Sequence, residues 1–251
     1  MTQTPPDAVG PGPSVAVIIP AKDEAARIAA TVRATLGLPG VDLVVVVDDG
    51  SRDATQDIAS QAGALVARHP LNRGKASALQ TGLDVVARRD AREGRVGADR
   101  RLVLFVDADL EESAAEVGVL VAPVAQGEAD MTIAVLPPQR SPGGGRGLVV
   151  GLARDGIQEL TGWTPTQPLS GMRCLSPAAL EAGTPLAPGW GVETALTVDV
   201  LSAGLRVLEV PCALHHRVTG SDWRGQLHRA EQYRDVLRAL AVRRLRRRVG
   251  R

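Results

Sequence analysis

LVLFVDADL, residues 102–110, is the stretch of this chain that decides the fold. Its leading apolar residues are typical of a strand that is buried on both faces. Asp107 and Asp109 follow, one residue apart. Since residues i and i+2 of a strand point to the same side, we expect both carboxylates to emerge together where this strand ends. Paired carboxylates form a site for a hard divalent cation; the plainer interpretation is that each one caps the next helix.

Strand-like and helix-like segments alternate around this stretch. Predicted strands cover residues 15–19, 43–47, 64–67 and 131–135. Predicted helices cover residues 23–36, 53–61, 74–89 and 114–125, and residues 91–101 form a charged surface excursion. Alternation with short links predicts an α/β fold, in which a mostly parallel central sheet carries helices on both faces.

The loops that follow the predicted strands hold most of the candidate site. Right-handed crossovers place the carboxyl ends of parallel strands at one rim, where open α/β sheets bind ligands. The segments that gather there are residues 20–24, 48–51, 73–75 and 107–109. Lys22 and Lys75, the only lysines among 29 basic residues, both belong to these loops. A lysine suits a phosphate, so this rim favours a nucleotide diphosphate bound with Mg²⁺ or Mn²⁺.

The second half is less regular. It holds a glycine-rich loop at 141–147, a helix at 148–160, an irregular segment at 164–171, a helix ending at 202, a strand at 206–210 and a basic helix from about Trp223. This half carries too little core to stand alone. We therefore expect one domain over residues 15–240, made of a nucleotide-binding half (15–136) and a second half (137–240), between a disordered leader (1–14) and a basic tail (241–251).

Composition narrows the class of protein. A net charge of +1 argues against a general nucleic-acid binder. Cys174 and Cys212 lack CxxC spacing and predict reduced core thiols in a cytoplasmic protein. No apolar stretch approaches the ~20 residues of a membrane-spanning helix, and the leader lacks the features of a signal peptide. The arginine-dense residues 243–251 indicate either a solvated helix end or a peripheral contact with anionic lipid at the inner face of the membrane.

Four motifs in order carry a family resemblance. VAVIIPAKDE (15–24), VVVVDDGSRDAT (44–55), NRGKASAL (72–79) and VLFVDADL (103–110) together resemble glycosyltransferase family 2. The resemblance implies the GT-A fold, a three-layer α/β sandwich with a Rossmann-like nucleotide-binding half. It also implies that residues 15–136 bind the nucleotide sugar and that residues 137–240 form the acceptor half. By matched position it implies that the nucleotide sugar is contacted by Pro20, Ala21, Glu24, Asp49, Lys75 and Asp107. Asp49 matches the acid that hydrogen-bonds the base, and Asp109 matches the metal-binding residue of the DxD pair.

The second half is similar to the glucosyl-3-phosphoglycerate synthase and dolichyl-phosphate-mannose-synthase-like branches. The similar stretches are GGGRG (143–147), QPLSGMRCLS (167–176), APGWGVETAL (187–196) and HHRVTG (215–220). In the former branch a late histidine before an arginine is a third metal ligand, which matches His216, with His215 as the near alternative. A histidine at a strand end that bonds only to backbone is the simpler interpretation.

Three positions of the second half are candidates for the acceptor side and for catalysis. Glu193 either orients or deprotonates an acceptor hydroxyl, or is an acid favourably placed in a first helical turn. Trp190 either stacks on a sugar or packs. Gly144 and Arg146 either bind an anionic group of the acceptor or belong to a plain link. The Leu148–Val149 pair stands where the synthase branch has Val-Thr, which weakens the transfer of its acceptor to this chain.

The expected activity is metal-dependent transfer of a sugar from a UDP-sugar, such as UDP-glucose, to a small phosphorylated or polyprenyl-phosphate acceptor. Asp109 and Glu193 are the expected catalytic residues. A haloacid-dehalogenase-type phosphatase would have Thr or Val at Glu111, and a sugar-phosphate nucleotidyltransferase would have a glycine in PAKDEAAR. A non-catalytic nucleotide-sugar-binding protein is the main alternative. A polyprenyl-phosphate acceptor would require peripheral docking, and a homodimer is left open.

Overall fold

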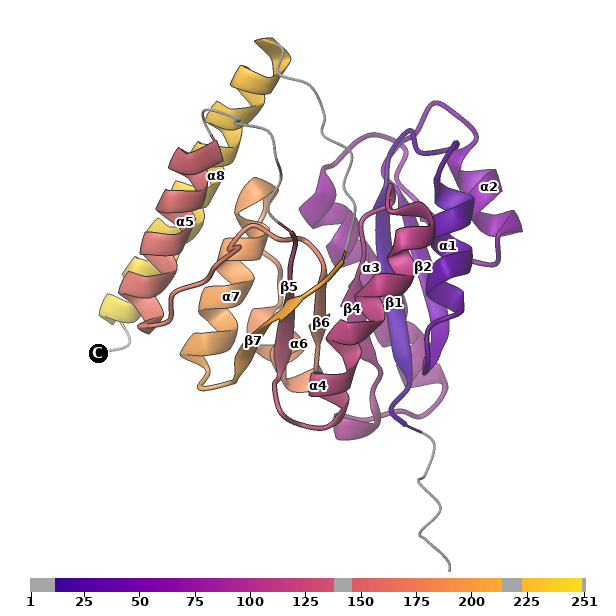
Figure 1. Ribbon diagram of the computed structural model, residues 1–251, viewed down its shortest axis with the longest axis horizontal. Coiled ribbons are helices and arrows are strands. Elements are labelled where there is room, and N and C mark those ends of the chain that lie inside the picture. Colours follow the sequence, from indigo (N-terminus) through magenta and orange to yellow (C-terminus); the bar gives the residue numbers. More distant parts are fainter. Residues whose placement is uncertain (1–11, 138–145, 214–222, 250–251) are drawn as a thin grey trace, which may run out of the picture.

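The computed structural model describes residues 12–137, 146–213 and 223–249, and within these ranges seven strands form one sheet. The strands are β1 (Val15–Ala21), β2 (Val41–Asp48), β3 (Leu65–Arg68), β4 (Leu102–Phe105), β5 (Met131–Val135), β6 (Arg173–Leu175) and β7 (Val207–Pro211). Their order is β3-β2-β1-β4-β6-β5-β7 (Figure 1). Only β6 is antiparallel to its neighbours, β4 and β5. The predicted mostly parallel α/β sheet is confirmed.

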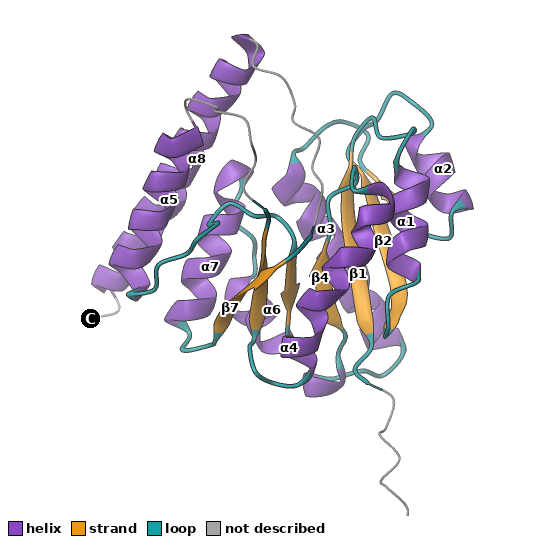
Figure 2. Cartoon of the chain, in the orientation of Figure 1, coloured by secondary structure: helices purple, strands orange, loops and turns teal. Residues whose placement is uncertain are grey.

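Helices cover both faces of the sheet (Figure 2). They are α1 (Ile28–Leu36), α2 (Thr55–Gln61), α3 (Lys75–Arg92), α4 (Val121–Ala125), α5 (Arg146–Thr161), α6 (Pro177–Gly183), α7 (Val192–Ser202) and α8 (Trp223–Val249), with short 3₁₀ helices η1 (Gly97–Asp99), η2 (Glu111–Leu120) and η3 (Gly189–Gly191). None of these described helices has the length and apolar character needed to span a membrane.

The continuous apolar runs of the central strands follow from burial on both faces. Val17 of β1 packs with Ile28 of α1 on one face, whereas its neighbour Ile18 packs with Leu79 and Phe105 on the other. A strand covered on one face only would alternate apolar and polar residues. A third apolar cluster joins α5, α7 and α8 beyond the sheet edge (Figure 1).

Several local predictions need correction. The strand of the LVLFVDADL stretch ends at Phe105, so Asp107 and Asp109 lie in the following loop and turn, and the side-chain alternation of a strand does not orient them. The helix predicted from residue 23 begins at Ile28, because Asp23 adopts a left-handed φ of 56° and residues 22–27 form a loop. The helix predicted at 114–125 is 3₁₀ over η2 and α-helical only in α4.

Arginines of two charged segments are also more deeply buried than the sequence suggested. Arg101, expected in a surface excursion, is only 4% exposed and donates to Asp90, Asp42 and Glu93. The arginines from Arg243 to Arg248 belong to α8, which extends to Val249. Arg243 is buried against Asp199 of α7, which joins the end of α8 to the rest of the protein.

Candidate active site

The candidate site is built around one lysine. Lys75 is the first residue of α3, and Gly74 before it has a φ of 86°, a left-handed conformation that glycine adopts without strain. The Lys75 Nζ atom lies 2.7 Å from Asp107 Oδ1 and 3.7 Å from Glu193 Oε1. These three side chains come from α3, the loop after β4 and the first turn of α7. The rim thus holds one cation between two carboxylates.

Burial and charge act against each other in this group. Burial raises the pKa of Glu193, while the nearby Lys75 and Arg173 charges partly oppose that shift. For Lys75, burial alone lowers the pKa, but the carboxylates of Asp107 and Glu193 outweigh it, and the pKa of the ammonium is raised. Lys75 therefore stays charged at neutral pH, where it neutralises one of its two acidic partners.

Arg173 supports Glu193 from below the rim. It belongs to β6, is 1% exposed, and donates to the Glu193 carbonyl oxygen at 3.0 Å and to Thr197 Oγ1 at 2.8 Å. A further bond to the Ser170 carbonyl fixes the plane of the guanidinium. Burial lowers the pKa of Arg173 to about 10, so it remains protonated at pH 7. One feature of the sequence indicates its importance: a single arginine stands inside the otherwise apolar GMRCL.

Gly171 closes the other side of the lysine. A Cβ atom added to Gly171 would overlap the Lys75 Nζ atom and would lie 3.4 Å from Asp107 Oδ1. The backbone of the segment before β6 therefore passes directly against the ion pair. Gly171 belongs to the stretch QPLSGMRCLS, but nothing in that stretch alone indicates its contact with Lys75.

Asp49, expected to bind the base, is held beneath the loop that leads to Lys75. Its Oδ1 accepts from the Arg73 N–H at 2.8 Å and contacts His69 Nδ1 at 2.7 Å, and its Oδ2 accepts from the Gly74 N–H at 2.7 Å. The residue is 5% exposed. Asp49 thus fixes the loop before α3, a task that the motif alone did not indicate, and its contact with the base stays a prediction.

Gly50, the next residue of the DDGS motif, must be glycine for a steric reason. Gly50 has a φ of 75°, and a Cβ atom there would lie 2.7 Å from the Asn72 nitrogen and 2.8 Å from the Leu71 carbonyl carbon. The loop before α3 crosses over Gly50 at this point. Only glycine permits both the left-handed backbone and the close approach.

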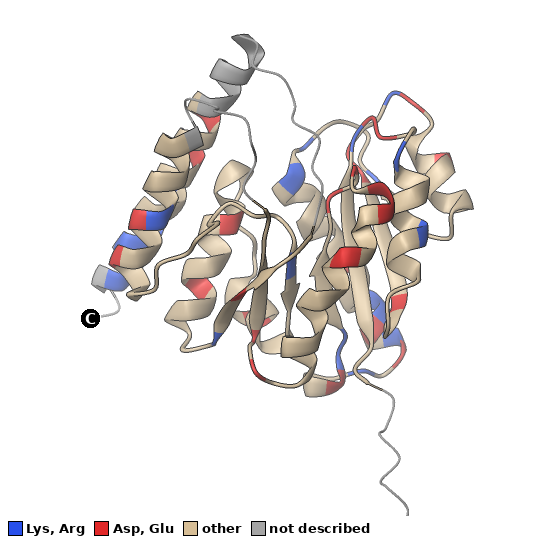
Figure 3. Cartoon of the chain, viewed as in Figure 1, with Lys and Arg blue, Asp and Glu red and all other residues tan. Residues whose placement is uncertain are grey.

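Glu24 and Asp109 form a separate acidic part of the rim. Glu24 accepts from Arg27 Nε at 2.8 Å; burial raises its pKa, Arg27 opposes that shift, and the charge of Asp109 adds to it. Pro20 and Ala21 end β1 just before this loop, and the Ala21 carbonyl accepts from the Asp49 N–H at 2.8 Å. Acidic segments gather where η2 begins beside α1 (Figure 3). This places three predicted donor contacts next to the DxD segment.

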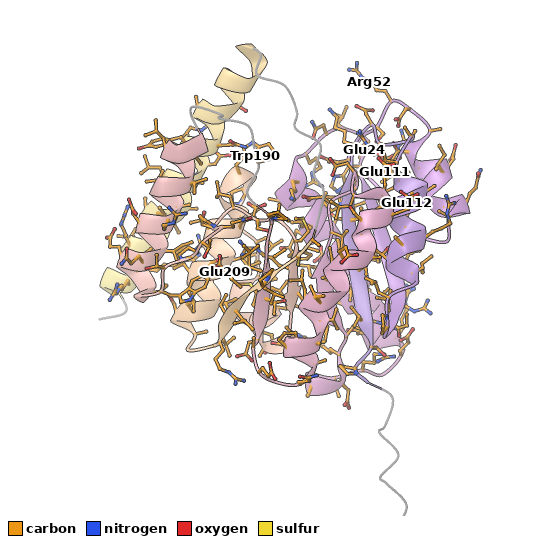
Figure 4. The ribbon with its side chains drawn as sticks, viewed as in Figure 1. Glu24, Arg52, Glu111, Glu112, Trp190 and Glu209 are labelled. Carbon is orange, nitrogen blue, oxygen red and sulfur yellow. The ribbon has the colours of Figure 1, made fainter. Side chains whose placement is uncertain are left out.

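Trp190 faces Lys75 across a cavity. Asn72, Gly74, Lys75, Gly189, Trp190 and Glu231 line a space of about 390 Å³. The Trp190 N–H donates to Asp235 Oδ2 of α8 at 3.1 Å, which anchors η3. Trp190 and Glu24 stand on different sides of the rim (Figure 4). The predicted acceptor residue Trp190 thus shares a cavity with Lys75.

The family follows from comparison with known proteins. Residues 16–166, more than half of the chain, match Glycosyl transferase family 2. The chain belongs to this family. The expected resemblance and the expected glycosyltransferase class are thereby confirmed.

Proteins of similar sequence or structure come from Methanocaldococcus jannaschii and Mycobacterium tuberculosis. An uncharacterised protein of Methanocaldococcus jannaschii is 29% identical over 201 residues, which is 78% of this chain and 79% of the relative. Glucosyl-3-phosphoglycerate synthase of Mycobacterium tuberculosis, in complex with Mn²⁺, UDP-glucose and phosphoglyceric acid, is 28% identical with a TM-score of 0.69, over 92% of this chain and 80% of that one. Its complex with Mg²⁺ and UDP gives 27% identity and a TM-score of 0.70, over 92% and 79%. The GT-A fold prediction is confirmed.

The described part of this family 2 member supplies two of the expected metal ligands. Asp107 and Asp109 offer carboxylate oxygens, the donors that Mg²⁺ and Mn²⁺ prefer. Among residues 12–137, 146–213 and 223–249, no three acidic, histidine or cysteine side chains are grouped to hold a metal. The other predicted residues, His215, His216 and Gly144, and the side chain of Arg146, lie outside the described part.

Proposed function

We propose that this protein transfers a sugar from a UDP-sugar, such as UDP-glucose, to an acceptor that carries a phosphate, with Mg²⁺ or Mn²⁺ as cofactor. The observation that carries the proposal is the ion-paired group of Lys75, Asp107 and Glu193 at the carboxyl edge of the sheet. The bound UDP-glucose and phosphoglyceric acid of the mycobacterial relative support the choice of substrates.

The donor side would use the first-half loops. Pro20, Ala21, Glu24 and Asp49 are assigned to the nucleotide, and Lys75 to its diphosphate. The Lys75 ammonium is already held by two carboxylates, so an incoming diphosphate meets a cation at a fixed position. Asp107, Asp109 and His216 are assigned to the divalent cation, which would neutralise the charge that develops on the leaving diphosphate.

The acceptor side would use the cavity beside α8. Trp190 of the second half lines a cavity together with Lys75, and the carboxylate of Glu193 lies 3.7 Å from the Lys75 Nζ atom. Glu193 is assigned to orient the acceptor hydroxyl or to remove its proton, and burial raises the pKa of its carboxyl, which makes the carboxylate a stronger base than an exposed glutamate. Gly144 and Arg146 are assigned to the phosphate of the acceptor. This acceptor is either a small phosphorylated molecule or a polyprenyl phosphate.

The test is a transfer assay with UDP-glucose and Mn²⁺, in which phosphoglyceric acid and a polyprenyl phosphate are offered separately. Product formation with one acceptor, lost on chelation and restored by Mn²⁺, is the expected result. Asp109→Ala should abolish turnover with its circular dichroism spectrum intact. Unchanged turnover in that variant would refute the metal assignment. Binding of UDP-sugar without transfer to either acceptor, and without hydrolysis, would favour the non-catalytic alternative.

Peripheral membrane contact and a homodimer stay predictions. Leu237 and Leu245 of α8 are 43% and 63% exposed, and Arg238 lies on the same helix. Exposed leucines among arginines suit an anionic lipid surface. Co-sedimentation with vesicles of anionic and of neutral lipid measures the first prediction, and light scattering measures the second.

A further inference from the structure

His69 contacts Asp49 of the candidate site, although it belongs to none of the four sequence motifs. It follows β3 directly and is 4% exposed. Its Nδ1 atom lies 2.7 Å from Asp49 Oδ1, and its Nε2 atom lies 2.9 Å from Thr81 Oγ1. The ring therefore bridges the end of β2 and the second turn of α3.

The partners decide which nitrogen carries the hydrogen. A carboxylate oxygen only accepts, so Nδ1 must donate to Asp49. In the neutral ring Nε2 then accepts from the Thr81 hydroxyl. Both ring nitrogens are thus satisfied by groups on different elements. An aliphatic side chain would fill the same space and make neither bond.

A continuous chain of short bonds leads from this ring to the candidate site. His69 fixes Asp49, whose two oxygens accept from the Arg73 and Gly74 N–H groups at 2.8 and 2.7 Å. Gly74 is followed by Lys75, whose Nζ bonds Asp107 Oδ1 at 2.7 Å. Through Thr81 the same ring also holds the helix that begins at Lys75.

We infer that His69 is a positioning residue for the donor site, which acts through Asp49 and Thr81 to set the place of the Lys75 ammonium that meets the diphosphate of a nucleoside-diphosphate sugar. This inference rests on the proposed function for its consequence in turnover. The geometric part, that His69 sets the place of Lys75, stands apart from any substrate.

The chain itself offers a readout that needs no substrate. Lys75 and Lys22 are its only lysines, and their side chains are 25% and 45% exposed. An amine-selective acylating reagent, followed by peptide mass spectrometry, gives the ratio of their labelling rates. Lys22 serves as the internal standard for Lys75. The ratio reports how firmly the Lys75 ammonium is held by Asp107.

Three substitutions separate the effects of the two hydrogen bonds of the His69 ring. His69→Leu removes both bonds. His69→Asn keeps an amide donor near the position of Nδ1 and so retains the bond to Asp49. Thr81→Val removes only the bond at Nε2. Val86→Ala, a buried position further along α3, is the matched control for general loss of stability.

The expected result is a higher Lys75 to Lys22 labelling ratio in His69→Leu, restored most of the way in His69→Asn, with no change in Val86→Ala. The KM for the UDP-sugar should rise about tenfold in His69→Leu, the size expected for one charge-assisted hydrogen bond, with a smaller change in kcat. If His69→Leu does not fold, Thr81→Val carries the test: loss of the bond to α3 should raise its labelling ratio above that of Val86→Ala.

An unchanged labelling ratio in every His69 and Thr81 variant that folds would overturn the inference, as would a ratio that rises equally in Val86→Ala. Failure of the proposed function would look different. The wild-type protein would then bind no UDP-sugar, while the labelling ratio would still respond to His69.

Discussion

Replacing Gly171 with alanine tests whether the place of the Lys75 ammonium governs turnover. Gly171 does not have the left-handed backbone that penalises other residues, so the substitution adds a methyl group without backbone strain. That methyl group meets the Lys75 Nζ atom first and Asp107 Oδ1 next, at 3.4 Å. The perturbation is therefore confined to the ion pair.

The size of the displacement follows from contact distances. Non-bonded heavy atoms rest about 3.5 Å apart, and the new Cβ atom would lie so far inside that distance that Nζ must move by about 1 Å. Lys75 is flexible at its tip, so folding should tolerate the shift. A misplacement of about 1 Å costs on the order of 10²-fold in rate where positioning drives the reaction. We expect kcat/KM for the UDP-sugar to fall by about that factor.

The assay is the initial rate of transfer from UDP-glucose, measured together with the melting temperature. Gly151→Ala is the matched control, because Gly151 lies within α5 with nothing within 4 Å of an added Cβ atom. That control should gain about 0.5–1 kcal/mol of stability and keep its activity. An unchanged kcat/KM in Gly171→Ala, with the protein folded, would refute the reasoning that Lys75 must stand where it does.

Three further outcomes follow from the same contacts. Glu193→Gln should lower kcat by about 10²–10⁴-fold at unchanged UDP affinity. Because burial raises the pKa of Glu193 above 4.5, the wild-type rate should fall as the pH drops through that raised value. The pH–rate profile of the variant should lack this fall at acidic pH. Gly50→Ala should lose more stability in urea unfolding than Gly94→Ala, because both have a left-handed φ but only Gly50 meets neighbouring backbone; equal losses would contradict the crossing of the two loops. Arg101→Ala should cost about 3–5 kcal/mol by the same measurement, since it leaves the buried Asp90 carboxylate uncompensated, and a loss typical of a surface arginine would contradict the burial of this network.

The strands of the fold could be predicted where a single physical cause dominates. The runs at 15–19, 43–47 and 131–135 are apolar throughout because the strands are covered on both faces, and burial of that kind is visible in sequence. Strand β6 escaped prediction because it has three residues and includes Arg173, whose guanidinium is held by backbone carbonyl oxygens and by the Thr197 hydroxyl, contacts that the local sequence pattern does not show. Its antiparallel direction depends on pairing with β4 and β5, which no local pattern encodes.

The candidate site, too, could be predicted only in part from the sequence. Lys75 and Asp107 lie in short motifs at strand ends, so their place at the rim follows from topology alone. The hydrogen bonds that Asp49 accepts from the loop before α3 could not be predicted in this way, because that loop returns over the motif 24 residues later in the chain. Gly171 and His69 likewise act through contacts across the fold, which a motif read in isolation leaves out.

The contacts around Lys75 also explain why a lysine stands here in a chain whose basic residues are mostly arginine. Its 29 basic residues are otherwise almost all arginine. An ammonium is compact and has three donors, so it can reach Asp107 and Glu193 and still offer a hydrogen to a phosphate. A guanidinium is a broader planar fork, and Gly171 lies so close to the Lys75 Nζ atom that even an added Cβ atom would overlap it. The lysine and the glycine therefore constrain each other: the site requires a small cation because a main chain passes beside it, and that main chain can pass so close only because residue 171 has no side chain.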